Sequence, residues 1–426
     1  MKNVIEALAE RGFIDQMTSP DLKEKLAKPS KVYLGFDPTA DSLHLGNLVG
    51  IVALAWFQKF GHTPYALIGG ATGRIGDPSG KSAERPLLDQ HELDHNVASL
   101  KKFLVKILEV PQGPKPVVLN NNDWLGTFTL IDFLRDVGKH FRVGPMLAKE
   151  SVRARLETEE GMSFTEFSYQ LLQGYDFHYL NQKYGVLVQL GGSDQWGNIT
   201  AGTEFNRKVK GEQIFGLTFP LLTRSDGKKF GKSEEGAIWL SAEKLSPYRF
   251  YQYLFRVPDA DVIRLLKMLT FMDLSEIHAI EQSMRLADYE PNSAQKKLAE
   301  EVTRFVHGEE GLKAALRVTA GIQPGSEAKL SSEVLKEIAA DMPHASMPYD
   351  EVVGKKWIDV AVKIGLFPSK SEGVRLVKNG GAYLNNERID DPGFAIEKNH
   401  LIDGEFLLLS SGKKKKILIE IHPVKK

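Results

Sequence analysis

Thirteen consecutive residues decide the fold of this chain: Gly35-Phe36-Asp37-Pro38-Thr39-Ala40-Asp41-Ser42-Leu43-His44-Leu45-Gly46-Asn47. The apolar run 31–36 predicts a short buried strand, and the run 48–60 predicts an apolar helix with Asp41 or Ser42 as its N-cap. A helix that begins just after a strand carries unpaired N–H groups and a positive dipole end, which favours phosphate binding. Gly46 lets a ligand approach the backbone closely. The stretch therefore predicts a nucleotide site.

The composition indicates a globular protein of two or three domains. The chain has 426 residues, and this length is too great for one ordinary core. Of these residues, 42% are hydrophobic and 26% are charged, as in a globular protein. It has no cysteine, which excludes disulfides, thiol catalysis and cysteine-ligated zinc. The apolar run 49–57 is too short to span a membrane, and the amphipathic start with Glu6 and Glu10 does not resemble a signal peptide. We expect a cytoplasmic protein that does not contact a membrane.

Strand and helix patterns alternate through the first half of the chain. Strands are expected at 31–36, 63–68, 116–119 and 186–190, and helices at 46–60, 89–108, 129–141 and 163–184. This order predicts an α/β domain over residues 1–245 with a Rossmann-like parallel sheet. Active sites of such sheets lie at the carboxyl ends of the strands. His44, Gly69-Gly70 and Gly191-Gly192 all follow expected strand ends.

The second half of the chain changes character twice. Helical patterns at 247–255, 260–270, 274–287 and 293–307 predict a helical domain over 246–321, followed by a partly helical linker at 322–351. Residues 352–426 are expected to form a small α+β module with helices at 356–364 and 369–378 and strands at 382–384, 406–409 and 417–421. From Lys355 onward there are 14 Lys/Arg against 9 Asp/Glu, a net +5, so the remainder carries −5. A polyanion partner is expected there, the alternative being lysines that serve solubility.

Two stretches carry phosphate-binding signals. A lone histidine at a helix start is usually a cap, but Thr39 and His44 together are placed to donate to one phosphate. The second stretch is Lys229-Phe230-Gly231-Lys232-Ser233. Its glycine-rich, polar surroundings predict a mobile loop whose lysines close over a leaving polyphosphate, the alternative being a solvated basic turn.

Three further stretches predict a pocket beside these signals. The glycine-rich run 69–81 is not a Walker A motif, but Lys81 and Arg85 supply two cations. Gly191-Gly192 and Asp194 combine open backbone with a carboxylate, as a ribose requires, although an Asx-turn explains the same residues. Tyr169, Gln173 and Asp176 are spaced by four and three residues, so they share one helix face and suggest a pocket wall.

Taken together, these motifs resemble the bacterial tyrosyl-tRNA synthetases, a family of class I aminoacyl-tRNA synthetases. The resemblance covers essentially the whole chain. It rests on the HIGH-type signature at 39–47, the KMSKS-type signature at 229–233 and the run Gly-Gly-Ser-Asp-Gln-Trp-Gly-Asn at 191–198. It implies a Rossmann-like catalytic domain, a helical domain on the anticodon side and a small RNA-binding domain.

The resemblance also implies roles for individual residues. Tyr33 and Asp176 resemble the pair that binds the phenol hydroxyl of tyrosine. The cradle for the α-ammonium is implied at Asp77, Tyr169 and Gln173, and further pocket residues at Thr72, Asn121, Gln189 and Gln195. ATP-binding positions are implied at Asp37, Gly46, Gly192, Asp194 and Lys232. The groups implied to act on the transferring phosphate and pyrophosphate are Thr39, His44, Asn47, Lys81, Arg85, Lys229, Lys232 and Ser233.

Asn47 departs from the family pattern, which has histidine there. Asparagine still donates a hydrogen bond but cannot carry charge, so we expect activity to survive. The second signature is also loosened, with Phe230-Gly231 between its lysines.

The implied reaction has two steps. The carboxylate of L-tyrosine attacks the α-phosphate of ATP, which gives tyrosyl-adenylate and pyrophosphate, and the tyrosyl group then passes to the 3′ end of tRNA(Tyr). Mg²⁺ is expected to accompany ATP, held by phosphates and water, and no protein-bound structural metal is expected. Lys370, Arg375, Lys378 and the 413–416 turn are expected to meet tRNA phosphates, and a homodimer through the region 128–167 is implied.

Three alternatives remain open from the sequence. A tryptophan-specific synthetase shares the fold, but Tyr33 with Asp176 favours a phenol. A small-molecule nucleotidyltransferase shares the His-x-Gly signature but does not need the terminal domains. A non-catalytic RNA-binding protein on the same scaffold does not need the polar pocket residues.

Overall fold

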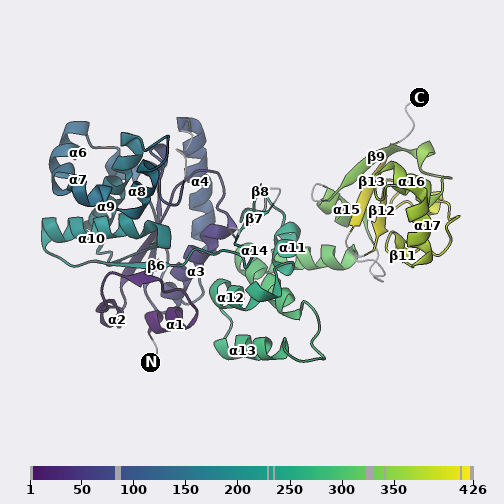
Figure 1. The fold of residues 1–426 in the computed structure, drawn as a ribbon, viewed down its shortest axis with the longest axis horizontal. Coiled ribbons are helices and arrows are strands. Elements are labelled where there is room, and N and C mark those ends of the chain that lie inside the picture. Colours follow the sequence, from purple (N-terminus) through teal and green to yellow (C-terminus); the bar gives the residue numbers. More distant parts are fainter. Residues whose placement is uncertain are drawn as a thin grey trace. The chain divides into compact units, whose positions relative to one another are not determined.

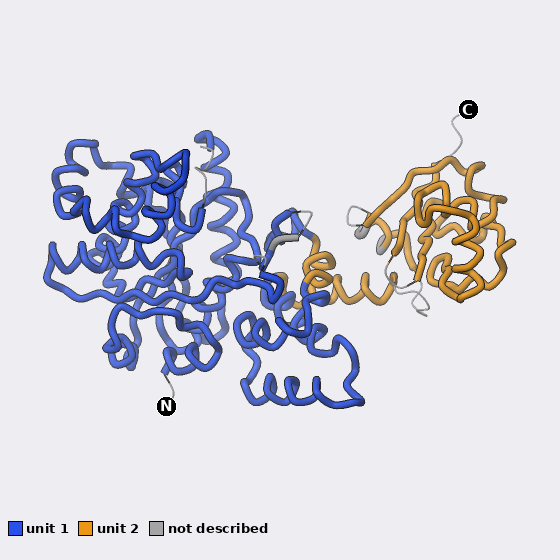
Figure 2. The backbone as a smooth tube through the Cα atoms, viewed as in Figure 1, with its two compact units in different colours: residues 1–245, 254–306 blue, residues 246–253, 307–426 orange. Residues whose placement is uncertain are grey.

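The computed structural model describes residues 3–81, 88–227, 230–233, 236–322, 330–339, 342–412 and 415–422. Its contacts divide the chain into two compact units, coloured separately in Figure 2. Unit 1 comprises residues 1–245 and 254–306, and unit 2 comprises residues 246–253 and 307–426.

Unit 1 is built on a mostly parallel sheet in the order β1-β6-β5-β2-β3-β4. The strands are β1 (Gln16–Met17), β2 (Lys31–Phe36), β3 (Thr63–Ile68), β4 (Val117–Asn120), β5 (Val188–Gly192) and β6 (Phe215–Phe219). Neighbouring strands from β6 to β4 pair in parallel, and β1 pairs antiparallel at the edge. The expected Rossmann-like parallel sheet is therefore confirmed, with β2 and β3 at their predicted bounds.

Helices cover both faces of this sheet (Figure 1). They are α1 (Val4–Glu10), α2 (Leu22–Lys25), α3 (Leu45–Lys59), α4 (Gln90–Ile107), α5 (Asn122–Leu125), α6 (Leu130–Asp136), α7 (Val143–Leu147), α8 (Glu150–Leu156), α9 (Phe164–Tyr184) and α10 (Trp196–Lys210). Helix α3 packs so close to β2 that a Cβ on Gly50 would lie 2.5 Å from Leu34 Cδ2. Helix α9 covers the opposite face, where its Phe177 lies 5.2 Å from the ring of Tyr33.

Some predicted elements differ from those observed. The helix expected at 129–141 is divided into α6 and the 3₁₀ turns Gly138–His140, because glycine is a poor helix former. Helix α10 and strand β6 were not expected. The run 215–219 is short and fully buried, and periodicity alone does not distinguish such a run from other buried segments.

The predicted N-cap of α3 is wrong. The helix begins at Leu45, and His44 is its N-cap. Asp41 instead forms an ion pair with Lys244 at 2.6 Å. Ser42 Oγ accepts a hydrogen bond from the Ser241 N–H at 3.1 Å. Both predicted caps are therefore occupied by a distant segment that local sequence patterns do not reveal.

The helical part of unit 1 follows the sheet in the chain. It contains α12 (Asp259–Leu269), α13 (Leu274–Ser283) and the first part of α14 (Ser293–Gly321). Arg11 joins this part to helix α3: its guanidinium lies 4.2 Å from the Trp56 ring centroid and donates to the carbonyl of Lys267 at 3.2 Å. Helix α14 bends at Gly308, which has φ 74°, and the division between the units falls beside this bend.

Unit 2 contains a five-stranded sheet in the order β11-β10-β12-β13-β9. Its strands are β9 (His344–Pro348), β10 (Ala382–Leu384), β11 (Glu387–Arg388), β12 (Phe406–Ser411) and β13 (Lys415–His422). Its helices include α15 (Ser332–Ala339), α16 (Trp357–Lys363), α17 (Lys370–Lys378) and most of α11 (Pro247–Phe255). The range 322–351, expected as a linker, thus holds α15 and β9, and β9 pairs in parallel with β13.

No helix in the described ranges is both long and apolar enough to cross a membrane. Those ranges also contain no group of three or more metal-ligating side chains.

A buried histidine connects β2 and β3. His62 is 2% exposed, and its Nδ1 accepts a hydrogen bond from the Ser30 N–H at 3.1 Å. Its ring packs edge-on against Phe57, with centroids 5.6 Å apart. Burial lowers the pKa of His62 to about 4, so the native protein keeps this imidazole neutral.

We predict that His62 makes the fold sensitive to acid. Between about pH 6.5 and pH 4 the unfolded chain binds a proton here that the native chain does not, so stability falls as the pH falls through this window. His62→Asn keeps an acceptor for Ser30 but does not titrate. Urea unfolding should show that the variant loses roughly 2 kcal/mol less than the wild type between pH 7 and pH 4.5.

The control is His278→Asn, at an exposed histidine of α13. It should keep the wild-type pH dependence. An equal acid loss in His62→Asn and the wild type would contradict the assignment.

Candidate active site

Buried polar side chains of β2, β5 and α9 lie near one another in the sheet domain, and this group is here called the pocket. Tyr33 on β2 and Gln189 on β5 are direct neighbours across the parallel pair, and they are 1% and 2% exposed. Neither Tyr33 Oη nor Gln189 Oε1 has a hydrogen-bond partner in the described part of the chain. Buried polar groups in native proteins are nearly always paired, so these two atoms point to a polar ligand.

Asp176 is the centre of the polar side of this pocket. It lies on α9 and is 2% exposed. Trp124 Nε1 donates to its Oδ1 at 2.7 Å, and Asn121 Nδ2 donates to its Oδ2 at 2.9 Å. Because a carboxylate oxygen has two lone pairs, each oxygen keeps capacity for one further donor.

Burial raises the pKa of Asp176 to about 7, against the lowering effect of the hydrogen bonds from Asn121 and Trp124. The pKa of Tyr33 is raised well above its usual value by burial and by the charge of Asp176. Tyr33 therefore stays protonated and is a donor, whereas Asp176 is an acceptor when ionised. A ligand hydroxyl that accepts from one and donates to the other satisfies both groups.

The network continues from Asp176 to the signature stretch. Asn121 Nδ2 also donates to Thr72 Oγ1 at 2.9 Å, and Thr72 Oγ1 donates to Asp37 Oδ1 at 2.8 Å. The second oxygen of Asp37 accepts from Tyr169 Oη at 2.9 Å. A Cβ on Gly69 would lie 2.1 Å from Asp37 Oδ1, so only glycine fits there. Residues of four distant segments thus form one polar wall.

A second carboxylate, Asp77, organises the next part of the pocket. Gln195 Nε2 donates to Asp77 Oδ2 at 2.6 Å, and the Ser79 N–H donates to Asp77 Oδ1 at 3.0 Å. Asn198 Nδ2 lies 3.3 Å from the same Oδ1. Gln173, half-buried on α9, lies one turn from Tyr169. Asp77 is 8% exposed and is thus a mostly buried negative charge within a polar cage.

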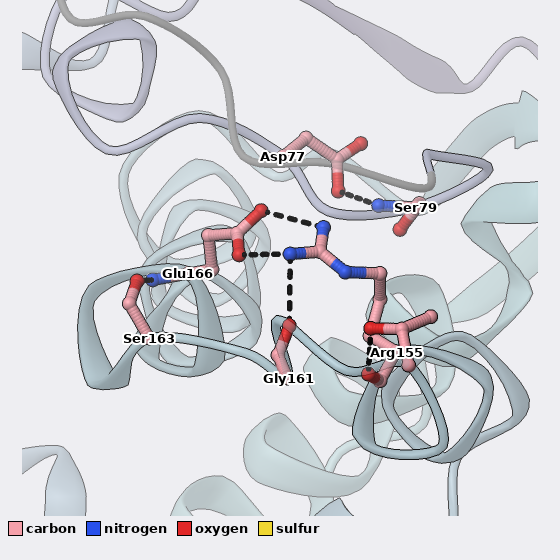
Figure 3. A network of polar contacts seen from close by, with 7 residues as sticks. Asp77, Ser79, Arg155, Gly161, Ser163 and Glu166 are labelled. Carbon is pink, nitrogen blue, oxygen red and sulfur yellow. Dashed lines mark hydrogen bonds and ion pairs between the residues drawn. The ribbon is translucent and has the colours of Figure 1, made fainter.

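A buried ion pair fixes the start of α9 (Figure 3). Arg155 on α8 donates to both carboxylate oxygens of Glu166 at 3.0 and 2.9 Å, and also to the Gly161 carbonyl at 3.0 Å. The two side chains are 3% and 2% exposed. The pair holds α8 and the connecting loop to the helix that carries Tyr169, Gln173 and Asp176.

The two signature stretches meet at the start of α3. His44 Nδ1 accepts from the Gly46 N–H at 3.1 Å, and Asn47 Oδ1 accepts from the His44 N–H at 3.1 Å. His44 is therefore a helix cap, as a lone histidine usually is. A Cβ on Gly231 would lie 3.0 Å from Gly46 N, which shows how closely the second signature packs on the first.

The other predicted residues are distributed around this junction. Gly192 and Gly80 both face Asp194, because a Cβ on either would lie 2.6 or 3.2 Å from an Asp194 carboxylate oxygen. Thr39 and Lys81 are exposed. Lys232 and Ser233 form strand β7, which pairs with β8 (Gly236–Ala237). Arg85 and Lys229 lie outside the described residues.

Several pocket residues were not expected from the sequence. Trp124, Ser79 and Asn198 all bond to the two central carboxylates. The run Asn120-Asn121-Asn122 at a strand end was a signal for this region, since Asn120 Oδ1 accepts from the Gly70 N–H at 3.2 Å. No local pattern marked Trp124, because its partner lies on another helix.

Comparisons with known proteins identify the family of the chain. The model of the class I tRNA synthetases (W and Y) matches residues 24–322, and that of the tyrosine–tRNA ligase SYY-like C-terminal domain matches residues 334–419. A tyrosine–tRNA ligase of Protochlamydia amoebophila is 58% identical over 99% of both chains. A chloroplastic/mitochondrial tyrosine–tRNA ligase of Arabidopsis thaliana is 54% identical over 98% of this chain and 84% of its own.

A solved structure agrees as well. The C-terminally truncated mitochondrial tyrosyl-tRNA synthetase of Aspergillus nidulans superposes with a TM-score of 0.66 at 34% identity, over 74% of this chain and 92% of that one. The family models and the relatives agree with one another, and the chain belongs to the tyrosine–tRNA ligases, a family of class I tRNA synthetases.

Proposed function

We propose that Tyr33 and Asp176 recognise the phenol hydroxyl of L-tyrosine in the reaction of this family. That reaction joins the tyrosine carboxylate to the α-phosphate of ATP as the bond to the β-phosphate breaks, which releases pyrophosphate. The tyrosyl group then passes from the adenylate to the 3′ end of tRNA(Tyr). The observation that carries the proposal is the buried Tyr33 hydroxyl, which has no described partner and lies in the field of Asp176.

The α-ammonium of tyrosine is assigned to the second carboxylate. Asp77, Tyr169 and Gln173 form its cradle, with the ammonium as a further donor to a buried negative charge. Thr72, Asn121, Gln189 and Gln195 complete the polar wall. Hydrogen bonds of Asn121 to Thr72 and Asp176, and of Gln195 to Asp77, support this role, since a preformed wall needs little reorganisation when the substrate binds.

ATP is assigned to the junction of the two signatures. Asp37, Gly46, Gly192, Asp194 and Lys232 bind it. The start of α3 offers the positive end of the helix dipole to its phosphates. The departing pyrophosphate is stabilised by Thr39, His44, Asn47, Lys81, Arg85, Lys229, Lys232 and Ser233. Asn47 Oδ1 already accepts a hydrogen bond from the His44 N–H, so the Asn47 NH₂ group is the one that donates to a phosphate oxygen.

Mg²⁺, tRNA and compartment complete the proposal. Mg²⁺ comes with ATP, bound by phosphates and water, because this ion retains water readily and is satisfied by few protein ligands. The tRNA backbone meets α17, whose cations are Lys370, Arg375 and Lys378. The cysteine-free composition supports a cytoplasmic protein.

The proposed function is tested by ATP–pyrophosphate exchange with purified protein and each amino acid in turn, without tRNA. We expect exchange with tyrosine alone. Exchange with another amino acid would overturn the pocket assignment, and no exchange with any amino acid would favour the non-catalytic alternative.

His44→Asn is the matched variant for the phosphate site. Asparagine remains a good N-cap, so α3 is preserved, but the imidazole is lost. The exchange rate should fall roughly tenfold to a hundredfold while tyrosine affinity stays unchanged. A wild-type rate in this variant would remove His44 from the mechanism.

We predict that Asp176→Asn relaxes selection against phenylalanine. The asparagine amide has one acceptor oxygen in place of two and turns N–H groups toward the donors of Asn121 or Trp124. The binding advantage of tyrosine over phenylalanine, which comes from the hydroxyl, should therefore fall. Tyrosine-specific synthetases are themselves the standard example of such hydroxyl-based selection. The kcat/KM ratio for tyrosine over phenylalanine, measured by exchange, should fall about tenfold to a hundredfold.

Two further variants complete this test. Trp124 stacks on Tyr179 with ring centroids 4.4 Å apart, and Trp124→Phe keeps an aromatic ring there but removes one donor to Asp176, so it should lower the ratio less. Tyr175→Phe, on the neighbouring residue of α9, should leave the ratio unchanged. An unaltered ratio in Asp176→Asn would refute the assignment.

The homodimer is assigned to a surface made by α6, α7, α8 and the first residue of α9, here called the apolar surface. Its members are large apolar side chains with 42 to 77% exposure: Leu130, Ile131, Leu134, Val143, Leu147, Leu156 and Phe164. They all lie within the expected region 128–167. So many exposed apolar side chains from consecutive elements favour a protein interface.

We predict that Phe164→Asp abolishes the dimer. Phe164 is 77% exposed, so the change should not disturb the core, but it places a charge in an apolar interface. Light scattering after gel filtration should give twice 47.5 kDa for the wild type and 47.5 kDa for the variant. Leu286→Asp, at an equally apolar residue with 60% exposure outside this surface, should remain dimeric. A monomeric wild type would exclude the interface.

A further inference from the structure

We propose that Asp261, a buried carboxylate on α12 outside the substrate pocket, is a positioning residue for the lysine-containing signature segment. This inference rests on the proposed function of that segment in pyrophosphate release. It assigns to the helical part of unit 1 an indirect role in the first step, which acts through the position of the signature segment.

Asp261 is 3% exposed and holds the chain just before the signature lysines. The Ser225 N–H donates to both of its carboxylate oxygens, at 3.0 and 3.1 Å, and Ser225 Oγ donates to Oδ2 at 3.1 Å. Arg264 Nη2 lies 3.3 Å from Oδ1 and also donates to the Thr223 carbonyl. Asp261 and Arg264 thus bind the backbone at Thr223 and Ser225 and the side chain of Ser225.

The far end of the same segment is attached to the phosphate site. The Phe230 N–H donates to the Leu222 carbonyl at 3.1 Å, and the Phe230 side chain is 5% exposed. The Ile238 N–H donates to the Gly231 carbonyl at 2.9 Å. The Leu45 N–H at the start of α3 donates to the Ile238 carbonyl at 2.8 Å. In the sequence, Lys229 lies between the Asp261 attachment and this second one, and Lys232 lies within the second.

Helix α12 is held against α3, the helix whose first residues belong to the phosphate site. Arg11 donates to the carbonyls of Lys267 and Thr270 at the end of α12, at 3.2 and 3.3 Å. Its guanidinium stacks on Trp56 of α3. Asp261 therefore attaches Ser225, at the start of the signature segment, to a helix that is already held against α3, the helix that begins beside His44 and Gly46.

A purely structural role must be distinguished from this one. Asp261 lies in the first turn of α12, where any carboxylate favours the helix dipole. Asp259 lies in the same turn and offers the same electrostatic benefit, but it accepts from Gln295 Nε2 at 2.5 Å and not from the signature segment. Asp259→Asn is thus a matched control for Asp261→Asn.

The test combines exchange kinetics with proteolysis on the full-length chain. In Asp261→Asn the kcat of ATP–pyrophosphate exchange should fall about tenfold, since small misplacements of catalytic groups have effects of this size, while KM for tyrosine stays within about twofold. Trypsin cleavage within 224–232, followed by mass spectrometry, should become several-fold faster. Asp259→Asn should match the wild type in kcat and cleavage. Ser225→Ala, which removes one of the three Ser225 bonds at an exposed residue, should give a smaller fall in kcat.

Each outcome decides the matter. Wild-type kcat and wild-type cleavage in Asp261→Asn would overturn the proposal. Equal losses of kcat in Asp259→Asn and Asp261→Asn would overturn it too. A rise in the tyrosine KM of Asp261→Asn in parallel with its fall in kcat would have the same meaning. If Asp261→Asn fails to fold, the Ser225→Ala kcat decides, and an unchanged value overturns the proposal. A wild-type protein that lacks exchange would refute the proposed function instead, and faster cleavage in Asp261→Asn would still support the attachment.

Discussion

The pocket depends on a buried carboxylate that the protein must keep satisfied. Asp176 is enclosed on α9 and receives hydrogen bonds from Trp124 and Asn121. Without these donors the charge would be too costly to bury, and the carboxyl would remain protonated. Because Asn121 also binds Thr72, which in turn binds Asp37, the requirements of one charge fix the ends of several strands.

The phosphate side is governed by a different constraint, which is backbone proximity. Gly231 has φ 85° and lies against the Gly46 N–H, so two stretches far apart in the sequence meet without side chains between them. His44 serves both structure and proposed chemistry, since its Nδ1 caps α3. A functional residue that is also a helix cap needs little additional support to be held in place.

Both sites are held from outside by buried ionic groups. The ion pair of Arg155 and Glu166 secures the start of α9 next to the apolar surface. For the helical part of unit 1, Arg11 provides the connection to α3, and Asp261 separately provides the connection to the signature segment. These groups lie outside the substrate pocket. They stabilise the elements that carry its residues.

The sequence by itself determined the alternation of strands and helices, the bounds of β2 and β3, and the motifs that identify the family, because these depend on local periodicity and on residue spacing. It also indicated that Tyr169, Gln173 and Asp176 share a helix face. Local patterns did not reveal the partners that occupy Asp41 and Ser42, strand β6, or the donors and attachments supplied by Trp124 and Asp261. Each of these depends on a partner distant in the chain: Lys244 and Ser241 occupy the predicted caps, and Trp124 and Asp261 have partners on other segments. Only the tertiary structure decided them, since hydrogen bonds and burial between distant segments exist only once the chain is folded.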